Sequence, residues 1–321
     1  MRIVIYSPAP VVTPLHKVNA ELASALDASD TLSAGIAAMP LPDSINAINA
    51  LAPQDKALHL PIVTAVDFLP AIHRAGPGWH SYDRANADLK MAAALYDVAF
   101  GALAIEGQIS SPEHLRGKKI GVPPRPSSVR LLTEALLRDG WGILDAVELI
   151  DLPPPAVPDA LSSGRIDATT WNLLTFGPGT LAPAIPGLLQ MPGAHWIDVD
   201  EHAIARINAA NPFKISQSQV QSDRTGAPGA RDATLLSFRQ GLAVWSTTPD
   251  DIVTEILERL AARCGGGLSP SDMADWPCAT ADLFHPAACA FFRRHGIAID
   301  PETGAAAIQS ARAQPAISNT A

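Results

Sequence analysis

Charged and aromatic residues are both scarce in this sequence. Asp, Glu, Lys and Arg make up 17% of the 321 residues, Phe, Trp and Tyr make up 5%, and hydrophobic residues make up 47%. This balance is typical of a folded globular chain and argues against intrinsic disorder. The net charge is −9 and no run of basic residues occurs, so we do not expect a nucleic acid as a partner. No apolar run approaches the roughly 20 residues that a membrane-spanning helix needs.

Cysteine is also rare, and the three that occur are Cys264, Cys278 and Cys289. They form no Cys-x-x-Cys pair and their odd number leaves at least one unpaired, so we expect buried thiols. The sequence has no nucleophile elbow, zinc-protease motif, phosphate-binding loop or dinucleotide fingerprint. His195 and His202 show no spacing typical of metal ligands. We therefore expect no metal, no cofactor and no catalytic set.

A secretory leader is missing from the start of the sequence. Met1 is followed at once by Arg2-Ile-Val-Ile-Tyr6, which predicts a strand, and not by a charged start, an apolar core and a cleavage site. Either a leader was removed before this numbering begins, which would make the protein periplasmic, or the protein is cytoplasmic.

The first 75 residues alternate between strand and helix three times. Apolar runs predict strands at 3–6, 31–37 and 59–64. Apolar residues at helical spacing predict helices at 13–26, from Ser44 onward, and at 66–75. This alternation indicates an α/β fold with a parallel sheet and helical crossovers.

The stretch from Gly117 to Trp171 repeats this alternation. It predicts strands at 119–122, 147–150 and 166–171, and helices at 129–138 and 159–163. Ser127 and Ser128 stand at the start of the first of these helices, where hydroxyl groups cap the chain. A helix start also has free N–H groups and the positive pole of the helix, so it predicts a binding site for a small anion such as a carboxylate.

The remaining elements are less regular. We interpret 90–105 as two extended pieces around Tyr96-Asp97, the second leading out of a first lobe, and 235–245 as the strand that returns to it. Elsewhere we expect a strand at 196–199, helices at 202–208, 252–264 and 286–295, an irregular helix at 181–189, an exposed loop at 217–231 and a frayed tail after Gly304. The sequence thus predicts two lobes, residues 1–98 with 236–321, and residues 99–235.

Short motifs along most of the chain resemble one protein family. They are Pro14-Leu15, Ser44-Ile-Asn-Ala-Ile-Asn-Ala-Leu51, Ala75-Gly-Pro-Gly-Trp79, Ala93-Ala-Leu-Tyr96, Leu115-Arg-Gly-Lys-Lys-Ile-Gly-Val122, Gly164-Arg-Ile-Asp-Ala168 and Leu283-Phe-His-Pro-Ala-Ala288. In these motifs the chain resembles the type 2 periplasmic binding proteins, and more narrowly the TAXI family of solute receptors for tripartite ATP-independent (TRAP) transporters. The most specific is His285-Pro286-Ala287-Ala288, where the family has His-Pro-Gly-Ala.

The resemblance implies a two-lobe fold in which each lobe is a mostly parallel sheet flanked by helices. It implies a monomeric receptor, not an enzyme, that captures a small carboxylate-bearing molecule in the inter-lobe cleft by hinge motion. The receptor would deliver this molecule to the membrane permease subunits of a TRAP transporter.

The chain departs from the family pattern at two turns. The family's glycine-rich turn after the first strand is Ser7-Pro-Ala-Pro10 here, and proline lacks the N–H that would approach a ligand. The family's Ser-Gly-Thr is Ser127-Ser128-Val129. These departures indicate a changed ligand or lost binding.

Polar groups from both lobes line the cleft of such a receptor. We expect Ser7, Thr13 and Ser44 from the first lobe, and Arg125, Ser127, Ser128, Thr169, Thr170, Trp171 and Asn172 from the second, to bind the ligand. Arg125 can hold a carboxylate with a forked pair of hydrogen bonds, and Trp171 can offer a flat wall.

Several of these residues have a purely structural alternative. Ser44 and Ser127 can act as helix caps only, Trp171 can belong to the core, and Arg125 can point into solvent. His285 precedes a proline at a helix start, and we interpret it as a residue that holds the last helix in place rather than as a general base.

A second function stays open, an enzyme on the same two-lobe scaffold of the kind found in the menaquinone pathway or in thiamine-pyrimidine synthesis. A cytoplasmic enzyme would explain the absent leader, whereas the TAXI-like motifs favour the receptor. We give the motifs more weight.

Overall fold

The computed structural model describes residues 1–27, 31–105, 109–176, 180–183, 187–221, 231–262, 268–277 and 280–299. Cys264, Cys278 and the tail after Gly304 lie outside the described residues, so the predictions made for them stay predictions. Cys289 is a half-buried free thiol.

The first part of the chain forms three parallel strands joined by helices. The elements are β1 (Arg2–Ser7), α1 (Pro14–Asp27), β2 (Ser33–Ala38), α2 (Asp43–Asn49), α3 (Pro53–Lys56), β3 (His59–Thr64) and α4 (Phe68–His73). Strand β1 lies between β2 and β3 and is parallel to both. Parallel neighbours require a crossover connection, and the helices supply it. The predicted alternation is confirmed.

The middle of the chain builds a second set of parallel strands. Its elements are β5 (Lys119–Val122), α5 (Ser128–Ala135), a π-helical turn (Leu136–Gly140), β6 (Glu148–Asp151), α6 (Val157–Ser162) and β7 (Ala168–Phe176). Strand β5 is parallel to both β6 and β7.

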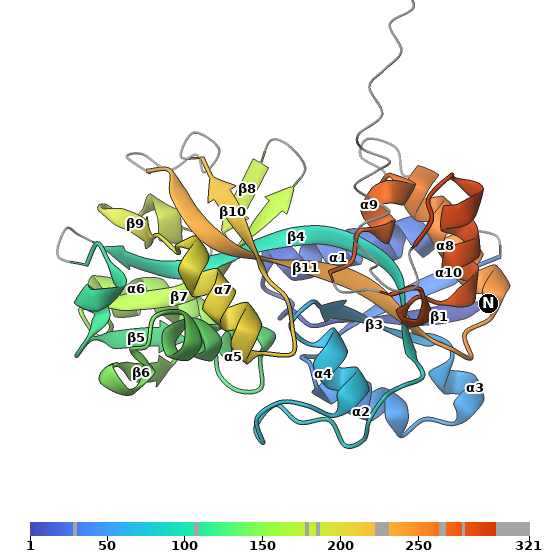
Figure 1. The fold of residues 1–321 in the computed structure, drawn as a ribbon, viewed down its shortest axis with the longest axis horizontal. Coiled ribbons are helices and arrows are strands. Elements are labelled where there is room, and N and C mark those ends of the chain that lie inside the picture. The colour runs from blue at the N-terminus through green and yellow to red at the C-terminus, as the bar shows by residue number, and fades with distance from the viewer. Residues whose placement is uncertain are drawn as a thin grey trace, which may run out of the picture.

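Two long strands join these sets into one sheet. They are β4 (Leu89–Ile105) and β11 (Ala233–Trp245), which pair antiparallel from Trp245 opposite Leu89 to Leu236 opposite Phe100. The sheet order is β2-β1-β3-β11-β4-β7-β5-β6, so its two ends are parallel and its centre is antiparallel. Figure 1 shows β4 and β11 running across both halves of the molecule.

The buried hydrophobic residues form separate cores in the two halves. One cluster combines residues from 3–95 with residues from 242–297, and two further clusters lie entirely within 99–235. A fourth cluster, between them, brings Ala9, Leu15 and Val66 against residues of the second half. The beginning and end of the chain therefore share a core, as the blue and red ribbons at one end of Figure 1 illustrate. The α/β fold is confirmed, while the lobe boundaries 1–98 with 236–321 and 99–235 stay a prediction.

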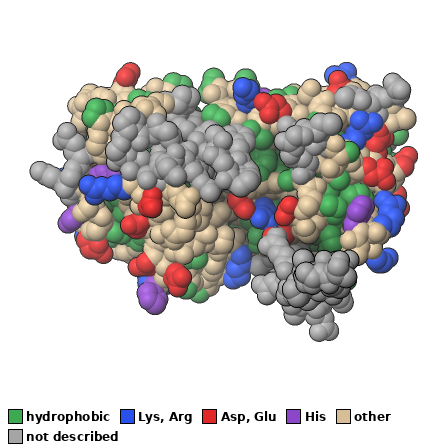
Figure 2. All heavy atoms as spheres, turned by 90° about the horizontal axis from the view of Figure 1, so that it is seen from above, with side chains coloured by type: hydrophobic (Ala, Val, Ile, Leu, Met, Phe, Trp, Pro, Cys, Tyr) green, Lys and Arg blue, Asp and Glu red, His purple; other side chains and the backbone are tan. Residues whose placement is uncertain are grey.

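The C-terminal helices cover the first half of the sheet. They are α8 (Asp250–Ala262), α9 (Pro270–Ala274) and α10 (Pro286–Arg294). The buried face of α8 includes Ile252, Ile256, Leu257 and Leu260, the residues whose spacing predicted it. Within the described ranges, no helix has both the length and the hydropathy to cross a membrane. On the face shown in Figure 2, acidic and basic side chains are interspersed.

Several local predictions are wrong. Residues 90–105 form one strand rather than two pieces, because β11 pairs with β4 from Leu89 to Phe100. Register shifts occur in β11 between Gln240 and Gly241 and between Leu242 and Ala243. Of the segment 181–189, expected to be an irregular helix, residues 184–186 lie outside the described residues. Residues 181–183 belong to a strand, β8 (Thr180–Pro183), and the segment ends in a short 3-10 turn (Leu188–Gln190). Pro183 cannot donate a helical hydrogen bond.

The segment expected to be an exposed loop begins as a strand. Strand β10 (Ser216–Val220) pairs antiparallel with β11, the next strand along the chain, so a polar sequence takes its hydrogen bonds from that strand. Residues 222–230 of the predicted loop lie outside the described residues. The remaining elements of this half, β9 (Ala194–Ile197) and α7 (Glu201–Ala210), lie close to the positions predicted for a strand and a helix.

Candidate functional site

A cavity of about 290 Å³ lies between the two halves of the molecule. One wall comes from the segment after β1 and from the ends of β2 and β3, and the other from the segment after β5, the start of α5 and the middle of β7. Phe238 and Gln240 of β11 complete the lining. The carboxyl ends of parallel strands meet here, which is where open α/β sheets bind their ligands.

Proline dominates this lining. The prolines are Pro8, Pro10, Pro40, Pro123, Pro124, Pro126 and Pro154. Because proline has no N–H, much of the backbone around the cavity cannot donate a hydrogen bond to a ligand. Among the described residues of the lining, none carries a charged side chain. Donor groups must therefore come from a few hydroxyl and amide side chains and from the start of α5.

Ser127 caps α5, as its position predicts. Its Oγ accepts a hydrogen bond from the N–H of Arg130 at 3.4 Å, and its carbonyl oxygen accepts one from the N–H of Leu131 at 3.0 Å. The N–H groups of Ser128 and Val129 come before Leu131, the first residue whose N–H donates to a carbonyl of the helix, so helix geometry leaves them without a partner inside the helix. This end of α5 presents donors and the positive pole of the helix to the cavity.

A buried carboxylate lies beside the cavity, between β3 and α4. Asp67 accepts a hydrogen bond from Thr64 at 2.5 Å, and its other oxygen lies 2.6 Å from His80 Nε2 and 3.3 Å from the Tyr82 hydroxyl. Burial by itself raises the pKa of Asp67, but the His80 ring and hydrogen bonding, including a contribution from Ser128 of the second half, outweigh burial and hold the pKa below its ordinary value.

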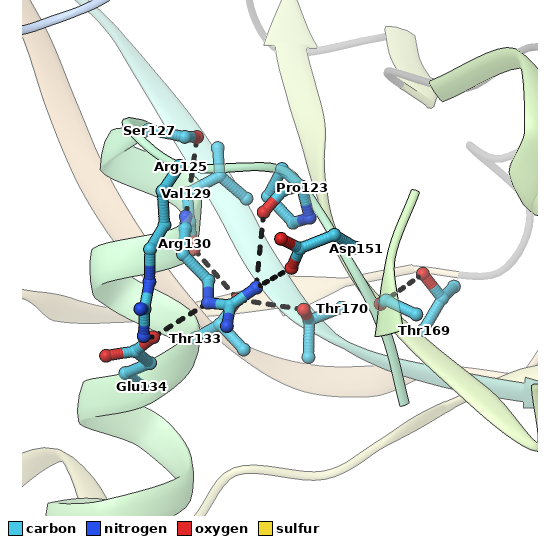
Figure 3. A network of polar contacts seen from close by, with 11 residues as sticks. Pro123, Arg125, Ser127, Val129, Arg130, Thr133, Glu134, Asp151, Thr169 and Thr170 are labelled. Carbon is cyan, nitrogen blue, oxygen red and sulfur yellow. Dashed lines mark hydrogen bonds and ion pairs between the residues drawn. The ribbon is translucent and has the colours of Figure 1, made fainter. Parts of the chain in front are cut away.

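Carboxylates hold the two arginines near the cavity (Figure 3). Arg130 is 5% exposed and lies 2.8 Å from Glu134 Oε1 and 2.5 Å from Asp151 Oδ1. Arg125 lies 2.5 Å from the same Glu134 oxygen, and its guanidinium carbon lies 4.6 Å from the centre of the Trp79 ring. Neither arginine lines the cavity. Arg125 would reach a bound ligand only by leaving Glu134.

The ten residues predicted to bind a ligand divide into two groups. Those that line the cavity are Thr13, Ser127, Ser128, Trp171 and Asn172. Those outside its lining are Ser7, Ser44, Arg125, Thr169 and Thr170.

Thr169 and Thr170 are buried, and both form hydrogen bonds within the second half. The hydroxyl of Thr169 donates to the carbonyl oxygen of Gly121 at 2.9 Å, and that of Thr170 lies 2.8 Å from the Thr133 hydroxyl. Figure 3 shows that Thr170 faces α5. Both residues fasten β7 to its neighbours.

Ser7 and Ser44 are also buried, at 0% and 1% exposure. Ser7 Oγ lies 2.9 Å from the amide nitrogen of Asn19. Ser44 lies in the first turn of α2, where Pro42 takes the cap position and no side chain caps the helix. The expectation that Ser44 is a helix cap is therefore wrong.

Two lining residues combine a structural role with their place at the cavity. Trp171 is 5% exposed and belongs to a core cluster, and whether it also contacts a ligand stays a prediction. Thr13 donates its hydroxyl proton to Pro10 at 2.7 Å. Asn172, by contrast, is 4% exposed, and its side-chain amide forms no hydrogen bond with any described residue.

Thr64, Phe238 and Gln240 are among the lining residues that the sequence interpretation missed. Thr64 ends a parallel strand, a position that could have identified it. Gln240 is a polar residue within a mostly apolar strand, and this contrast could have identified it. Within the described ranges, no group of three or more His, Cys, Asp and Glu side chains could hold a metal ion.

His285 holds the last helix, as predicted. Its Nδ1 accepts a hydrogen bond from the N–H of Ala287 at 3.3 Å, and its own N–H donates to Met91 at 2.9 Å. Burial lowers its pKa, and the nearby Asp250 only partly offsets this. His285 is not part of the cavity lining.

Comparison with known families identifies part of the chain. Residues 65–203 match the family described as NMT1/THI5 like. Over 90 residues the chain is 39% identical to a provisionally named binding protein of Brucella abortus (strain 2308), and equally to one of Brucella suis biovar 1. The match spans 28% of this chain and about a quarter, 27%, of each relative's length.

Two solved structures share the fold over nearly the whole chain. Rpa4515 of Rhodopseudomonas palustris, solved with adipate, has a TM-score of 0.51 and 18% identity, covering 97% of this chain and 92% of its own. MatC from the same organism, solved with bound malate, has a TM-score of 0.52 and 14% identity, covering 91% and 89%. At these identities the likeness shows the fold alone. The chain has the two-lobe fold of the periplasmic binding proteins.

Proposed function

We propose that this protein is a solute receptor that closes its two lobes around a small carboxylate-bearing molecule. The observation that carries the proposal is the cavity between the halves, with the start of α5 opening into it. Each half has its own core, and β4 and β11 are the long strands that run between them, which is the layout of a hinged receptor. The free N–H groups and positive pole of α5 suit an anion.

The lobes we propose are residues 1–98 with 236–321, and residues 99–235. Ser127 would donate its hydroxyl proton to the ligand, Trp171 would offer a flat surface and Asn172 an amide. The predicted residues outside the lining, Ser7, Ser44, Arg125, Thr169 and Thr170, would act by holding the walls in place. Adipate and malate in the two structures of the same fold support a carboxylate as the ligand class.

We further propose that the receptor acts in the periplasm, as a monomer, with the permease of a TRAP transporter. The support is the resemblance to the TAXI family, above all His285-Pro286-Ala287-Ala288. This part of the proposal is tested by the neighbouring genes and by the sequence upstream of Met1. A gene for a large permease and a leader would support it.

An enzyme on this scaffold is the second candidate. The match of residues 65–203 to the NMT1/THI5 like family and the buried Asp67–His80 pair favour it. His80, however, is fully buried and does not line the cavity, so its ring does not reach a ligand there. The receptor is the better supported function.

Thermal unfolding in the presence of carboxylates tests the receptor. Purified protein is heated with malate, adipate, benzoate or phenylacetate, and with the uncharged amide of each as control. Because a ligand that binds only the folded state adds about 2.7 kcal/mol at 100 times its Kd, at least one acid should raise the Tm and its amide should not. Small-angle scattering should show a smaller radius of gyration with that acid. Turnover of the bound molecule would instead support the enzyme, and no shift with any acid would refute the carboxylate receptor.

A further inference from the structure

Gln240 is a cavity residue placed where the two halves meet. It lies on β11, opposite Tyr96 of β4 on one side and Thr64 of β3 on the other. Its side chain is 1% exposed and lines the cavity. Its carboxamide oxygen lies 2.9 Å from the Tyr96 hydroxyl, and its nitrogen forms no hydrogen bond with any described residue.

Gln240 ends a chain of four polar side chains. Ser7 Oγ contacts the Asn19 amide at 2.9 Å, the same amide contacts the Tyr96 hydroxyl, and that hydroxyl contacts Gln240. We call this the Ser7–Gln240 hydrogen-bond chain. The N–H of Ala9 also donates to Ser7 Oγ, at 3.4 Å.

Counting protons fixes the direction of this chain. With the Asn19 nitrogen toward Ser7, the single proton of Tyr96 would have to serve the oxygens of both Asn19 and Gln240. The hydroxyl proton of the fully buried Ser7 would have no acceptor. Rotating the Asn19 amide by half a turn exchanges nitrogen and oxygen without moving any other atom. Ser7 then donates to Asn19, Asn19 to Tyr96, and Tyr96 to the Gln240 oxygen.

This direction gives both hydroxyl protons of the chain an acceptor and both amide oxygens a donor, as buried polar groups require. Rotating Gln240 instead would serve Tyr96 but would still leave the Ser7 proton without an acceptor. Burial also raises the pKa of Tyr96 far above its ordinary value, so the hydroxyl keeps the proton that it donates. The Gln240 oxygen is thus occupied, and the two protons on its nitrogen remain for the cavity.

The other donors of the cavity are few. Thr64 donates its hydroxyl proton to Asp67, and Thr13 donates its own to Pro10. Ser127 accepts from the backbone, so its proton remains available, as does the amide of Asn172.

We propose that Gln240 determines ligand specificity by donating its side-chain N–H to the ligand's carboxylate, with Ser7, Asn19 and Tyr96 as positioning residues. The proposal rests on the receptor function. The site would recognise the anion with uncharged donors, and the proline-rich walls with Trp171 and Phe238 would contact an apolar body. The ligand class is a carboxylate on a mainly apolar molecule.

Calorimetric titration with malate, adipate, benzoate and phenylacetate tests the ligand contact. Hydrogen bonds to charged groups are typically stronger than neutral ones, so Gln240→Glu should weaken binding of the acid that binds the wild type by about 10- to 100-fold or more. Gln240→Met should weaken it without adding a charge, which keeps the test valid if the Glu variant does not fold. Gln217→Glu, at an exposed position of β10, is the matched control and should bind like the wild type.

Nuclear magnetic resonance of the Gln240 side chain tests the direction of the chain without a ligand. In the wild type its amide protons should exchange rapidly with water, and Tyr96→Phe should shift its carbonyl carbon but leave that exchange unchanged. Slow exchange that becomes fast in Tyr96→Phe would mean that nitrogen faces Tyr96, and would overturn the proposal. Unchanged acid binding in both Gln240 variants would also overturn it, while leaving the receptor intact. If no acid binds the wild type, the receptor function fails and this inference fails with it.

Discussion

Replacing Asp67 by Asn removes a buried charge with almost no change in shape. The carboxylate is 0% exposed, accepts a hydrogen bond from Thr64 at 2.5 Å, and lies 2.6 Å from His80 and 3.3 Å from the Tyr82 hydroxyl. An amide turns one of these acceptor positions into a donor that faces other donors. Hydrogen bonds to a charged group contribute about 1.5–3 kcal/mol each, and the lower cost of burying a neutral amide offsets part of the loss. We expect the free energy of unfolding to fall by about 3 kcal/mol.

The loss of unfolding free energy caused by Asp67→Asn should depend on pH, and the pKa of Asp67 predicts in which direction. The pKa of Asp67 is lower in the folded protein than its ordinary value of 3.8. As the pH falls through that value, the unfolded chain takes up a proton before the folded one does, so stability is lost. The stabilisation by Asp67 is complete above this pH and decreases below it. The difference between wild type and Asp67→Asn should therefore narrow in acid.

Urea unfolding followed by tryptophan fluorescence, near neutral pH and again near pH 3.5, measures both effects. Asp83→Asn, at an exposed site nearby, is the control and should change stability by no more than about 0.5 kcal/mol. Thr64→Ala combined with Asp67→Asn should show a coupling energy of about 1 kcal/mol, because the two residues share a hydrogen bond. A loss below about 1 kcal/mol at neutral pH, or a difference that widens in acid, would refute the reasoning.

Three further substitutions test the packing at Gly241 of β11, the last helix and the arginine network. Gly241→Ala should lower the free energy of unfolding, measured in urea, by about 1–3 kcal/mol, since its Cβ would lie 2.6 Å from a tryptophan carbon and 2.9 Å from a carbonyl oxygen. Gly78→Ala, whose Cβ would have no atom within 4 Å, should lower it far less. His285→Asn keeps a capping side chain but removes the imidazole. Because the pKa of His285 is lowered in the folded protein, the wild type loses stability on acidification, and its Tm should fall more between about pH 7 and 5 than that of the variant. Glu134→Gln should cost about 3 kcal/mol in urea unfolding, because it leaves two arginines without their shared carboxylate.

Each of these predictions has a clear contrary result. Equal losses in the two glycine variants would mean that the β11 bulge has room for a side chain. A pH dependence that survives in His285→Asn but disappears in the exposed-site variant His202→Asn would assign the titration elsewhere. An unaltered stability in Glu134→Gln would mean that Arg130 is satisfied by Asp151 alone.

Local sequence patterns were sufficient for most elements of the fold. The strands at His59–Thr64 and Lys119–Val122 match their predictions residue for residue. Both are short apolar runs between turn residues, and their burial follows from that composition alone. The cap at Ser127 and the proline at the start of α10 were likewise readable, because a helix start depends on a few adjacent residues.

Strands with polar sequences could not be predicted in the same way. Residues Ser216–Val220 carry little apolar signal and become a strand only because β11 offers them an edge. The single strand β4 likewise depends on a partner about 140 residues away in the sequence. Such pairing depends on the arrangement of the whole sheet and leaves no mark in either segment.

The cavity was predicted in place, whereas its role in binding stays a prediction. A hydroxyl-bearing helix start predicted correctly that Ser127 and Ser128 would line a cavity, since a cap and its free N–H groups are local features. The sequence could not show that Glu134 holds Arg125, or that Ser7 is buried at the end of a hydrogen-bond chain leading to Gln240. Residue type and spacing determined which side chains could donate a proton. Only the tertiary structure decided which donors remain unused, because acceptors such as the Gly121 carbonyl for Thr169 lie far away in the sequence.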